Sequence, residues 1–131
     1  MKLFLNSLIF VLFITQLFSS QPVPYSGKVA IRGINFSGEA HFTFSLTDHK
    51  GGIKWRNGKD AKDTIKVSIS NGRYNVLLGG QGMNSLSPEL FLNHDKLFLQ
   101  VHIDLKDGKG LQYLGPDQRI TSSPRSLVAE I

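Results

Sequence analysis

The strongest constraint on the fold is an alternation of apolar and polar residues in short runs that end in turn residues. The clearest run lies at residues 39–47, where polar residues separate the apolar ones: Ala40, Phe42, Phe44 and Leu46. Successive side chains of a β-strand point to opposite faces, so a period of two indicates a strand with one buried face. We therefore predict a strand here with a core face and a solvated face.

The same pattern recurs along the chain. We predict further strands at residues 28–32, 53–56, 65–70, 73–78, 96–104 and 111–114. Asn71-Gly72 predicts a tight hairpin, because a type I′ turn needs positive φ at two successive residues and Asn and Gly tolerate it best. Ser87 followed by Pro88 predicts a short helical turn over residues 90–92.

Short strands without a long helical period between them predict an all-β fold, an antiparallel β-sandwich of about seven short strands. A small open barrel is the alternative. We place the sandwich domain at 27–115, after an extended lead-in at 21–26 that carries two prolines. Residues 116–131 are expected to form a linker and the start of a helix after Pro124, where Leu127, Val128 and Ile131 recur at helical spacing.

The N-terminus predicts export. Lys2 precedes an apolar run at 3–18, and Ser19 and Ser20 supply small residues beside a cleavage point. This is the pattern of a secretory signal peptide at 1–20, with an uncleaved membrane anchor as the alternative. We expect a secreted or cell-surface protein that meets the membrane only through the signal segment. The chain has no cysteine, so a hydrophobic core, without disulfides, must stabilise it.

Charge and motifs argue against several functions. A formal charge of +5 over 131 residues is spread along the chain, unlike the clustered basic surface of a nucleic-acid binder. The four histidines lack the close spacing of a metal site, and the glycines at 79–82 lack the lysine and serine of a phosphate-binding loop. We find no nucleophile with a base and no paired carboxylates, so neither an enzyme nor a cofactor is expected.

Contact with a partner is the remaining class of function. Polar, glycine-rich loops at 57–62 and 79–84 are the expected contact sites, with Asn57 and Gln81 as candidate residues. Sandwich modules that bind carbohydrate stack sugars on exposed aromatic rings, and Trp55, Phe98 and Tyr113 are candidates for that role. The alternative for each aromatic is a place in the core.

Several short motifs together resemble a known type of domain. They are VPYSGKV at 23–29, WRNG at 55–58, NGRY at 71–74, LLGGQGM at 77–83 and PDQRI at 116–120. With Leu90-Phe91-Leu92, Pro124 and Ala129-Glu130, they resemble an N-terminal domain of large secreted bacterial surface proteins, over residues 23–131. That resemblance implies no biochemical activity. It implies a β-domain handing over to helical, trimerising or fibre-like segments.

The resemblance and the residues lead to one expected function with one alternative. We expect an exported, non-enzymatic structural or interaction module, the head domain of a larger surface protein with a role in adhesion. Its partner would be a protein or a glycan on the cell surface, and its C-terminal helix would support a homo-oligomer. The chain would then be a fragment of a longer reading frame or a shortened member. The alternative is a carbohydrate-binding module that uses Trp55 with Tyr113.

Overall fold

The computed structural model describes residues 21–120. The expected signal peptide and the expected helix start after Pro124 lie outside the described residues. Within that range the strands are β1 (Val23–Lys28), β2 (Ala30–Ile31), β3 (Ile34–Asn35), β4 (Gly38–Thr47), β5 (Ile53–Arg56), β6 (Ile65–Ile69), β7 (Arg73–Leu78), β8 (Leu97–Asp104), β9 (Gln112–Tyr113) and β10 (Gln118–Ile120). The helix α2 (Pro88–Asn93) lies between β7 and β8.

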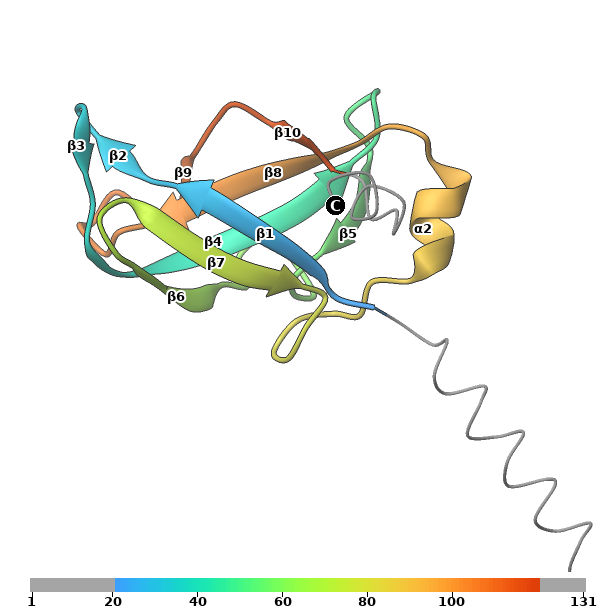
Figure 1. Ribbon diagram of the computed structural model, residues 1–131, viewed down its shortest axis with the longest axis horizontal. Coiled ribbons are helices and arrows are strands. Elements are labelled where there is room, and N and C mark those ends of the chain that lie inside the picture. Colours follow the sequence, from blue (N-terminus) through green and yellow to red (C-terminus); the bar gives the residue numbers. More distant parts are fainter. Residues whose placement is uncertain (1–20, 121–131) are drawn as a thin grey trace, which may run out of the picture.

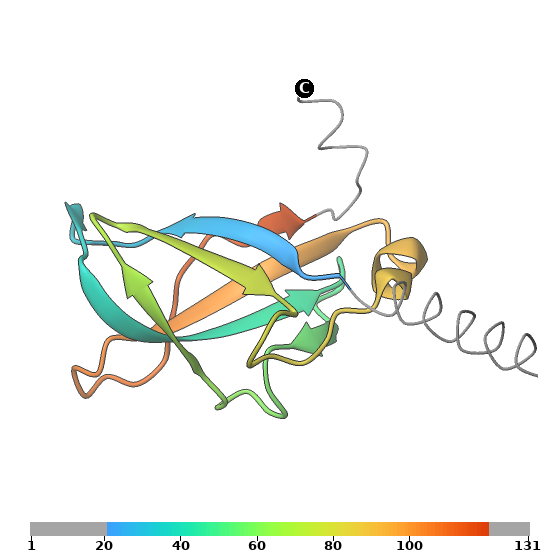
Figure 2. The same ribbon diagram turned by 60° about the horizontal axis from the view of Figure 1, so that its bottom comes forward.

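The strands form two layers. The larger sheet has the order β10-β8-β4-β5, with β6 paired to β4 and β9 paired to β8. The smaller sheet is the antiparallel ribbon of β1 and β7, which lies over β4 and β8 (Figures 1 and 2). A third ribbon of β2 and β3 projects at one end, and α2 lies at the other end (Figure 1). The all-β antiparallel sandwich is confirmed.

The core lies between the layers, and the alternation in the sequence placed its main residues correctly. The inward residues of β4 are fully buried, and those of β8 are at most 4% exposed: Leu97, Leu99, Val101 and Ile103. Val23, Tyr74 and Leu78 close the core from the ribbon above. Each buried aliphatic or aromatic side chain contributes about 1.5–3 kcal/mol through apolar burial. Because β4 and β8 carry most of the fully buried side chains, these two strands dominate the stability.

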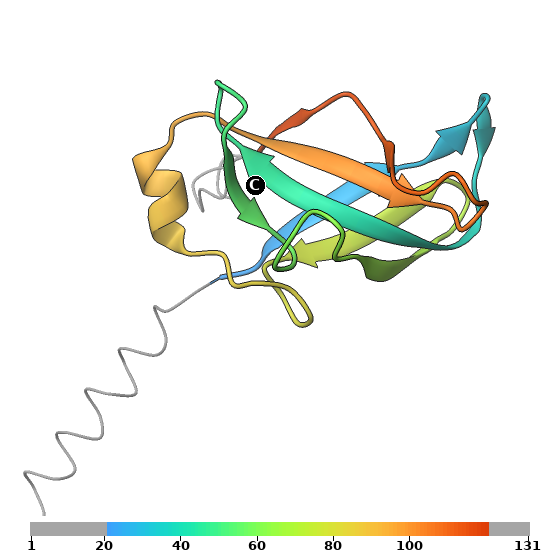
Figure 3. The same cartoon turned by 180° about the vertical axis from the view of Figure 1, so that it is seen from behind.

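The outer face of β4 differs from the expected solvated face. Thr43, Ser45 and Thr47 are only 5–6% exposed. β4 is central in its sheet, between β8 on one side and β5 and β6 on the other, as the view from behind shows (Figure 3). Longer side chains on these neighbouring strands therefore cover the small side chains of β4. The Thr43 hydroxyl also donates to the Asp63 carbonyl at 3.3 Å.

The Asn71-Gly72 turn forms as predicted and also moves the chain between the layers. Asn71 has φ of 49° and Gly72 has φ of 80°, and Ser70 and Arg73 exchange main-chain hydrogen bonds of 2.9 and 3.0 Å. β6 on one side of the turn pairs with β4, whereas β7 on the other side pairs with β1. The hairpin therefore joins the two sheets instead of extending one.

The ends of the domain lie outside the expected limits of 27–115. β1 begins at Val23, so the segment expected to be an extended lead-in at 21–26 is largely a paired strand. Residues 118–120, expected to belong to a linker, form β10 against β8. Two-residue strands such as β2, β3 and β9 bring the strand total above the expected seven.

The short helix agrees with its sequence signals. The Ser87 hydroxyl caps α2 by accepting from the Glu89 N–H at 3.3 Å, and Pro88 occupies the first helical position. Pro has no N–H to satisfy there, which is why the position favours it. Within residues 21–120, the helical segment is too short to cross a bilayer.

Candidate functional site

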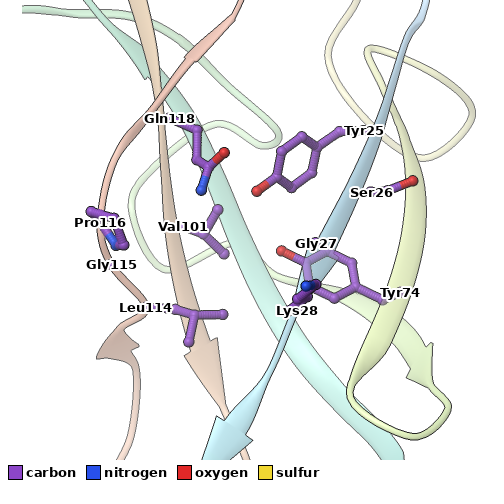
Figure 4. Close-up of a pocket in the computed structure, with 10 residues that line it drawn as sticks. All are labelled: Tyr25, Ser26, Gly27, Lys28, Tyr74, Val101, Leu114, Gly115, Pro116 and Gln118. Atoms are coloured by element: carbon purple, nitrogen blue, oxygen red, sulfur yellow. The ribbon is translucent and has the colours of Figure 1, made fainter.

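A groove of about 390 Å³ separates β1 from the chain that connects β9 to β10. Residues 25–28 form one wall, residues 114–116 and Gln118 form the other, and Val101 and Tyr74 complete the lining. The Tyr25 ring and the Gln118 amide project into it from opposite walls (Figure 4). The groove is thus an open seam between the small ribbon and the large sheet.

The main chain of β1 faces this seam with groups that β7 does not use. The Val29 N–H donates to the Gly72 carbonyl at 2.7 Å, on the β7 side of the strand. Because the N–H and C=O of successive strand residues alternate in direction, those of Gly27 and Tyr25 also face β7. Those of Ser26 and Lys28 face the seam. The main-chain N–H and C=O of Arg73, the residue opposite Lys28, bond to Ser70 and therefore point away from β1. This agrees with Lys28 having no main-chain bond to β7.

The opposite wall bulges away from β8. Tyr113 opposes His102 and Gln118 opposes Leu99, so five steps along this wall match three steps along β8. The two extra residues lie in the segment between β9 and β10, which remains tied to β8 by the bond from the Leu114 N–H to the Val101 carbonyl at 2.9 Å. The bulge leaves the seam open at this level.

Two tyrosines shape the floor of the groove. Tyr74 lies against Gly27, the residue opposite it on β1, and a Cβ atom on Gly27 would fall 2.3 Å from the Tyr74 ring. The rings of Tyr25 and Tyr74 are 6.1 Å apart. Burial raises the pKa of both phenols, and the nearby Tyr25 hydroxyl raises that of Tyr74 further. Both are therefore neutral hydrogen-bonding groups at physiological pH.

Among the residues of 21–120 that line the groove, Lys28 is the only charged one. It lies directly opposite Arg73 on the ribbon, and both side chains are exposed. The ion pairs within residues 21–120 are Lys54–Asp48, Lys66–Glu39 and Lys106–Asp104, and none of them includes Lys28 or Arg73. Lys28 therefore brings a positive charge to this end of the groove, and Arg73 lies beside it on the ribbon.

Trp55, a sequence candidate for sugar stacking, belongs to the core. It is 8% exposed and its indole N–H donates to the Asn84 carbonyl at 3.1 Å. A buried ring with a satisfied N–H offers no face to a sugar, so the expectation of an exposed platform at Trp55 is wrong. The alternation that suggested a strand at 53–56 placed this residue on the inner side.

Asn57, expected as a contact residue in an exposed loop, is only 3% exposed. β4 pairs with β6 as far as Phe42 and with β5 from Ser45, which leaves a gap between the two partners. Asn57 fills that gap. Its N–H donates to the Phe44 carbonyl at 3.0 Å and its Oδ1 accepts from the Phe44 N–H at 2.7 Å. Its role is structural.

The two loops expected to make contacts are bonded to each other. The Asn84 N–H donates to the Asn57 carbonyl at 2.8 Å, and the Asn84 side-chain amide donates to the carbonyls of Arg56 and Gly58 at 3.0 and 2.7 Å. Gln81 is exposed in the second loop. The structure thus gathers Trp55 and Asn57 around Asn84.

Tyr113 is exposed but lies apart from Trp55. It is 53% exposed on β9, its hydroxyl donates to Asp117 Oδ1 at 2.5 Å, and its ring lies 5.7 Å from that of His102. Phe98 is half-buried on β8 and, with Gln100 and Asp117, lines a separate shallow groove. The aromatic residues proposed for sugar binding therefore do not form one platform.

The groove itself was missed in the sequence because part of each wall falls outside the expected domain of 27–115. Tyr25 and Ser26 were assigned to the lead-in and Gln118 to the linker, whereas Lys28 and Leu114 lie in predicted strands. The available signal was the alternation of Val23, Tyr25 and Gly27 with Pro24 and Ser26, which continues the period of a strand. Within residues 21–120, no three His, Asp or Glu side chains gather in a group that could hold a metal ion.

The sequence matches a protein-family model over most of its length. The family model described as Domain of unknown function (DUF8740) matches residues 24–123. The chain belongs to this family. The DUF8740 match begins one residue after the start of β1 and extends past β10, so both walls of the groove lie within the family domain. Comparisons with curated proteins and with solved structures gave no match.

Proposed function

We propose that this chain is an exported, non-enzymatic structural and interaction module, the head domain of a larger extracellular or cell-surface protein. Its contact site is the groove beside β1. The observation that carries the proposal is the groove in Figure 4, which borders the edge of β1. On that edge, the main-chain groups of Ser26 and Lys28 make no hydrogen bond outside the β1–β7 ladder among the described residues. A sheet edge of this kind is a template for pairing with another chain, and natural proteins usually cover it.

The distribution of hydrogen bonds supports this location. Within residues 21–120, every buried side-chain nitrogen and oxygen atom has a hydrogen-bond partner. Two of the candidate contact residues already have hydrogen-bond partners within the domain: Trp55 donates to the Asn84 carbonyl, and Asn57 accepts from the Phe44 N–H of β4. The edge of β1 at Ser26 and Lys28 therefore stands out as a place where another chain could add bonds.

Export is the second part of the proposal and is supported by the sequence at 1–20, with its basic residue, apolar run and small residues. The role of a head domain is supported by the motifs at 23–29, 55–58, 71–74, 77–83 and 116–120, which resemble those of an N-terminal domain of secreted bacterial surface proteins. The carbohydrate alternative would have to rest on Tyr113 alone, because Trp55 is buried.

Site-specific photocrosslinking on native cells would test the proposal. A photoreactive amino acid at position 118, in the groove wall, is expected to crosslink the chain to a partner outside the cytoplasm. The matched control is the same residue at position 50, an exposed site in the turn between β4 and β5. Equal crosslinking at the two positions, no crosslinking at 118, or recovery of the chain only in the cytoplasm would contradict the proposal.

A further inference from the structure

We propose that the groove binds an extended peptide segment carrying a carboxylate, which adds to β1 as a new strand. This inference rests on the proposed function and specifies the partner. Strand addition is supported by the main-chain groups of β1, by the room beside them and by the charge at one end of the groove.

The main-chain groups fit strand addition. Ser26 and Lys28 each turn an N–H and a C=O toward the seam, and Pro24 adds a carbonyl. Groups two residues apart on a strand repeat about every 6.8 Å, the spacing at which a neighbouring strand supplies its own. Among the described residues, no hydrogen bond outside the β1–β7 ladder engages the main chain of Ser26 or Lys28. An added strand would supply these partners.

Pro24 fits the same arrangement. Proline lacks an N–H, so within a sheet it occurs at edges where no ladder bond is needed. At position 24 its nitrogen lies on the seam side of β1, away from β7, so β1 and β7 keep their pairing. Its position marks this side of β1 as an edge within the domain.

The groove has room for a strand. Its volume of about 390 Å³ lies within the usual range for ligand clefts, about 300–1,000 Å³. The bulged wall from Leu114 to Gln118 keeps the opposite side at a distance from β1. Tyr25, Leu114 and Val101 provide apolar surface for the inward side chains of an occupant, because alternate residues of a strand face the same side.

Charge selects the chemistry of the partner. Lys28 and Arg73 lie directly opposite each other, and like charges at such positions destabilise a sheet. An occupant with a carboxylate beside Lys28 would offset this repulsion. A second copy of the chain, paired through its own β1, would bring another Lys28 and Arg73 and no carboxylate from that strand. We therefore favour an acidic peptide over self-association.

Isothermal titration with two synthetic peptides tests the inference. The first is a capped seven-residue peptide of alternating threonine and valine with glutamate in place of one threonine, and the second has lysine at that position. The exported full chain is expected to bind the glutamate peptide about fivefold more tightly than the lysine peptide. Lys28→Glu should reverse this preference. Equal affinity for the two peptides would overturn the acidic specificity.

Ser26→Pro tests the use of the strand edge. It removes the N–H that faces the seam, while the bonds to β7 from Tyr25 and Gly27 remain, and it should weaken binding of the glutamate peptide roughly tenfold. The matched control Ser26→Ala keeps the N–H and should bind within about twofold of the parent. Unchanged binding in Ser26→Pro, or no binding of either peptide by the parent, would overturn strand addition.

The outcomes separate this inference from the proposed function. Crosslinking at position 118 without peptide binding would mean that the groove is a contact site for a partner that does not add a strand. A dimer of the parent chain in sedimentation that is lost in Ser26→Pro would identify a second copy as the occupant and would also overturn the inference. Absence of both crosslinking and peptide binding would reject both.

Discussion

Asn57→Ala is expected to lower the free energy of unfolding by about 1–3 kcal/mol, because it leaves the buried Phe44 N–H without a partner and the Asp63 carbonyl with only the Thr43 hydroxyl. The Asn57 side chain accepts from the Phe44 N–H at 2.7 Å and donates to the Asp63 carbonyl at 3.0 Å. Phe44 is fully buried, and the Asn57 main chain still covers this part of the edge of β4 in the variant, because its N–H donates to the Phe44 carbonyl. Water therefore cannot replace the lost bond to the Phe44 N–H without opening the sheet.

Urea denaturation followed by circular dichroism measures this effect. The matched control is Gln81→Ala, which truncates an exposed amide side chain from the other loop first considered for contact. An exposed substitution of this kind changes stability by less than about 0.5 kcal/mol. Similar unfolding midpoints for the two variants would show that Asn57 does not bridge the gap between β5 and β6.

Gly27→Ala is expected to cost about 1–3 kcal/mol of stability through overpacking. The added Cβ would lie 2.3 Å from the ring and hydroxyl of Tyr74, closer than any van der Waals contact. Tyr74 is 2% exposed and packs against Phe42 with ring centroids 4.6 Å apart, so it cannot move without disturbing the core.

A double-mutant cycle with Tyr74→Leu separates crowding from a general effect of alanine on the strand. The cost of Gly27→Ala should fall when the Tyr74 ring is absent, because residues in direct contact are not additive. Lys28→Ala, next to Gly27 but exposed, is the control on the same strand. An equal cost of Gly27→Ala with and without the ring would contradict the proposed packing.

The core strands could be predicted from the sequence because burial imposes a period of two on them. β4 and β8 lie side by side in one sheet, and every second residue of each strand points into the core. This pattern is visible in the sequence without knowing which strands pair. The Asn71-Gly72 turn and the Ser87 cap could also be predicted from the sequence, since both depend on local main-chain conformation and not on distant contacts.

The site could not be predicted in the same way because it depends on contacts between distant segments. Pro24 suggested an irregular lead-in, yet it is compatible with β1 because its nitrogen faces away from β7. Asn57 resembled an ordinary loop residue, and its role follows from the gap between β5 and β6 along β4. The walls of the groove come from opposite ends of the domain, and Ser26 and Gln118 are 92 residues apart in the sequence. Export and assembly remain predictions.

Amide hydrogen exchange of the free chain, resolved by residue with NMR, tests the central claim that the edge of β1 is open. The structure predicts alternating protection along one strand: slow exchange at Tyr25 and Gly27, whose N–H groups face β7, and fast exchange at Ser26 and Lys28, whose N–H groups face the groove. Protection at Ser26 and Lys28 equal to that at Gly27 would show that the seam is already paired, and would contradict the account.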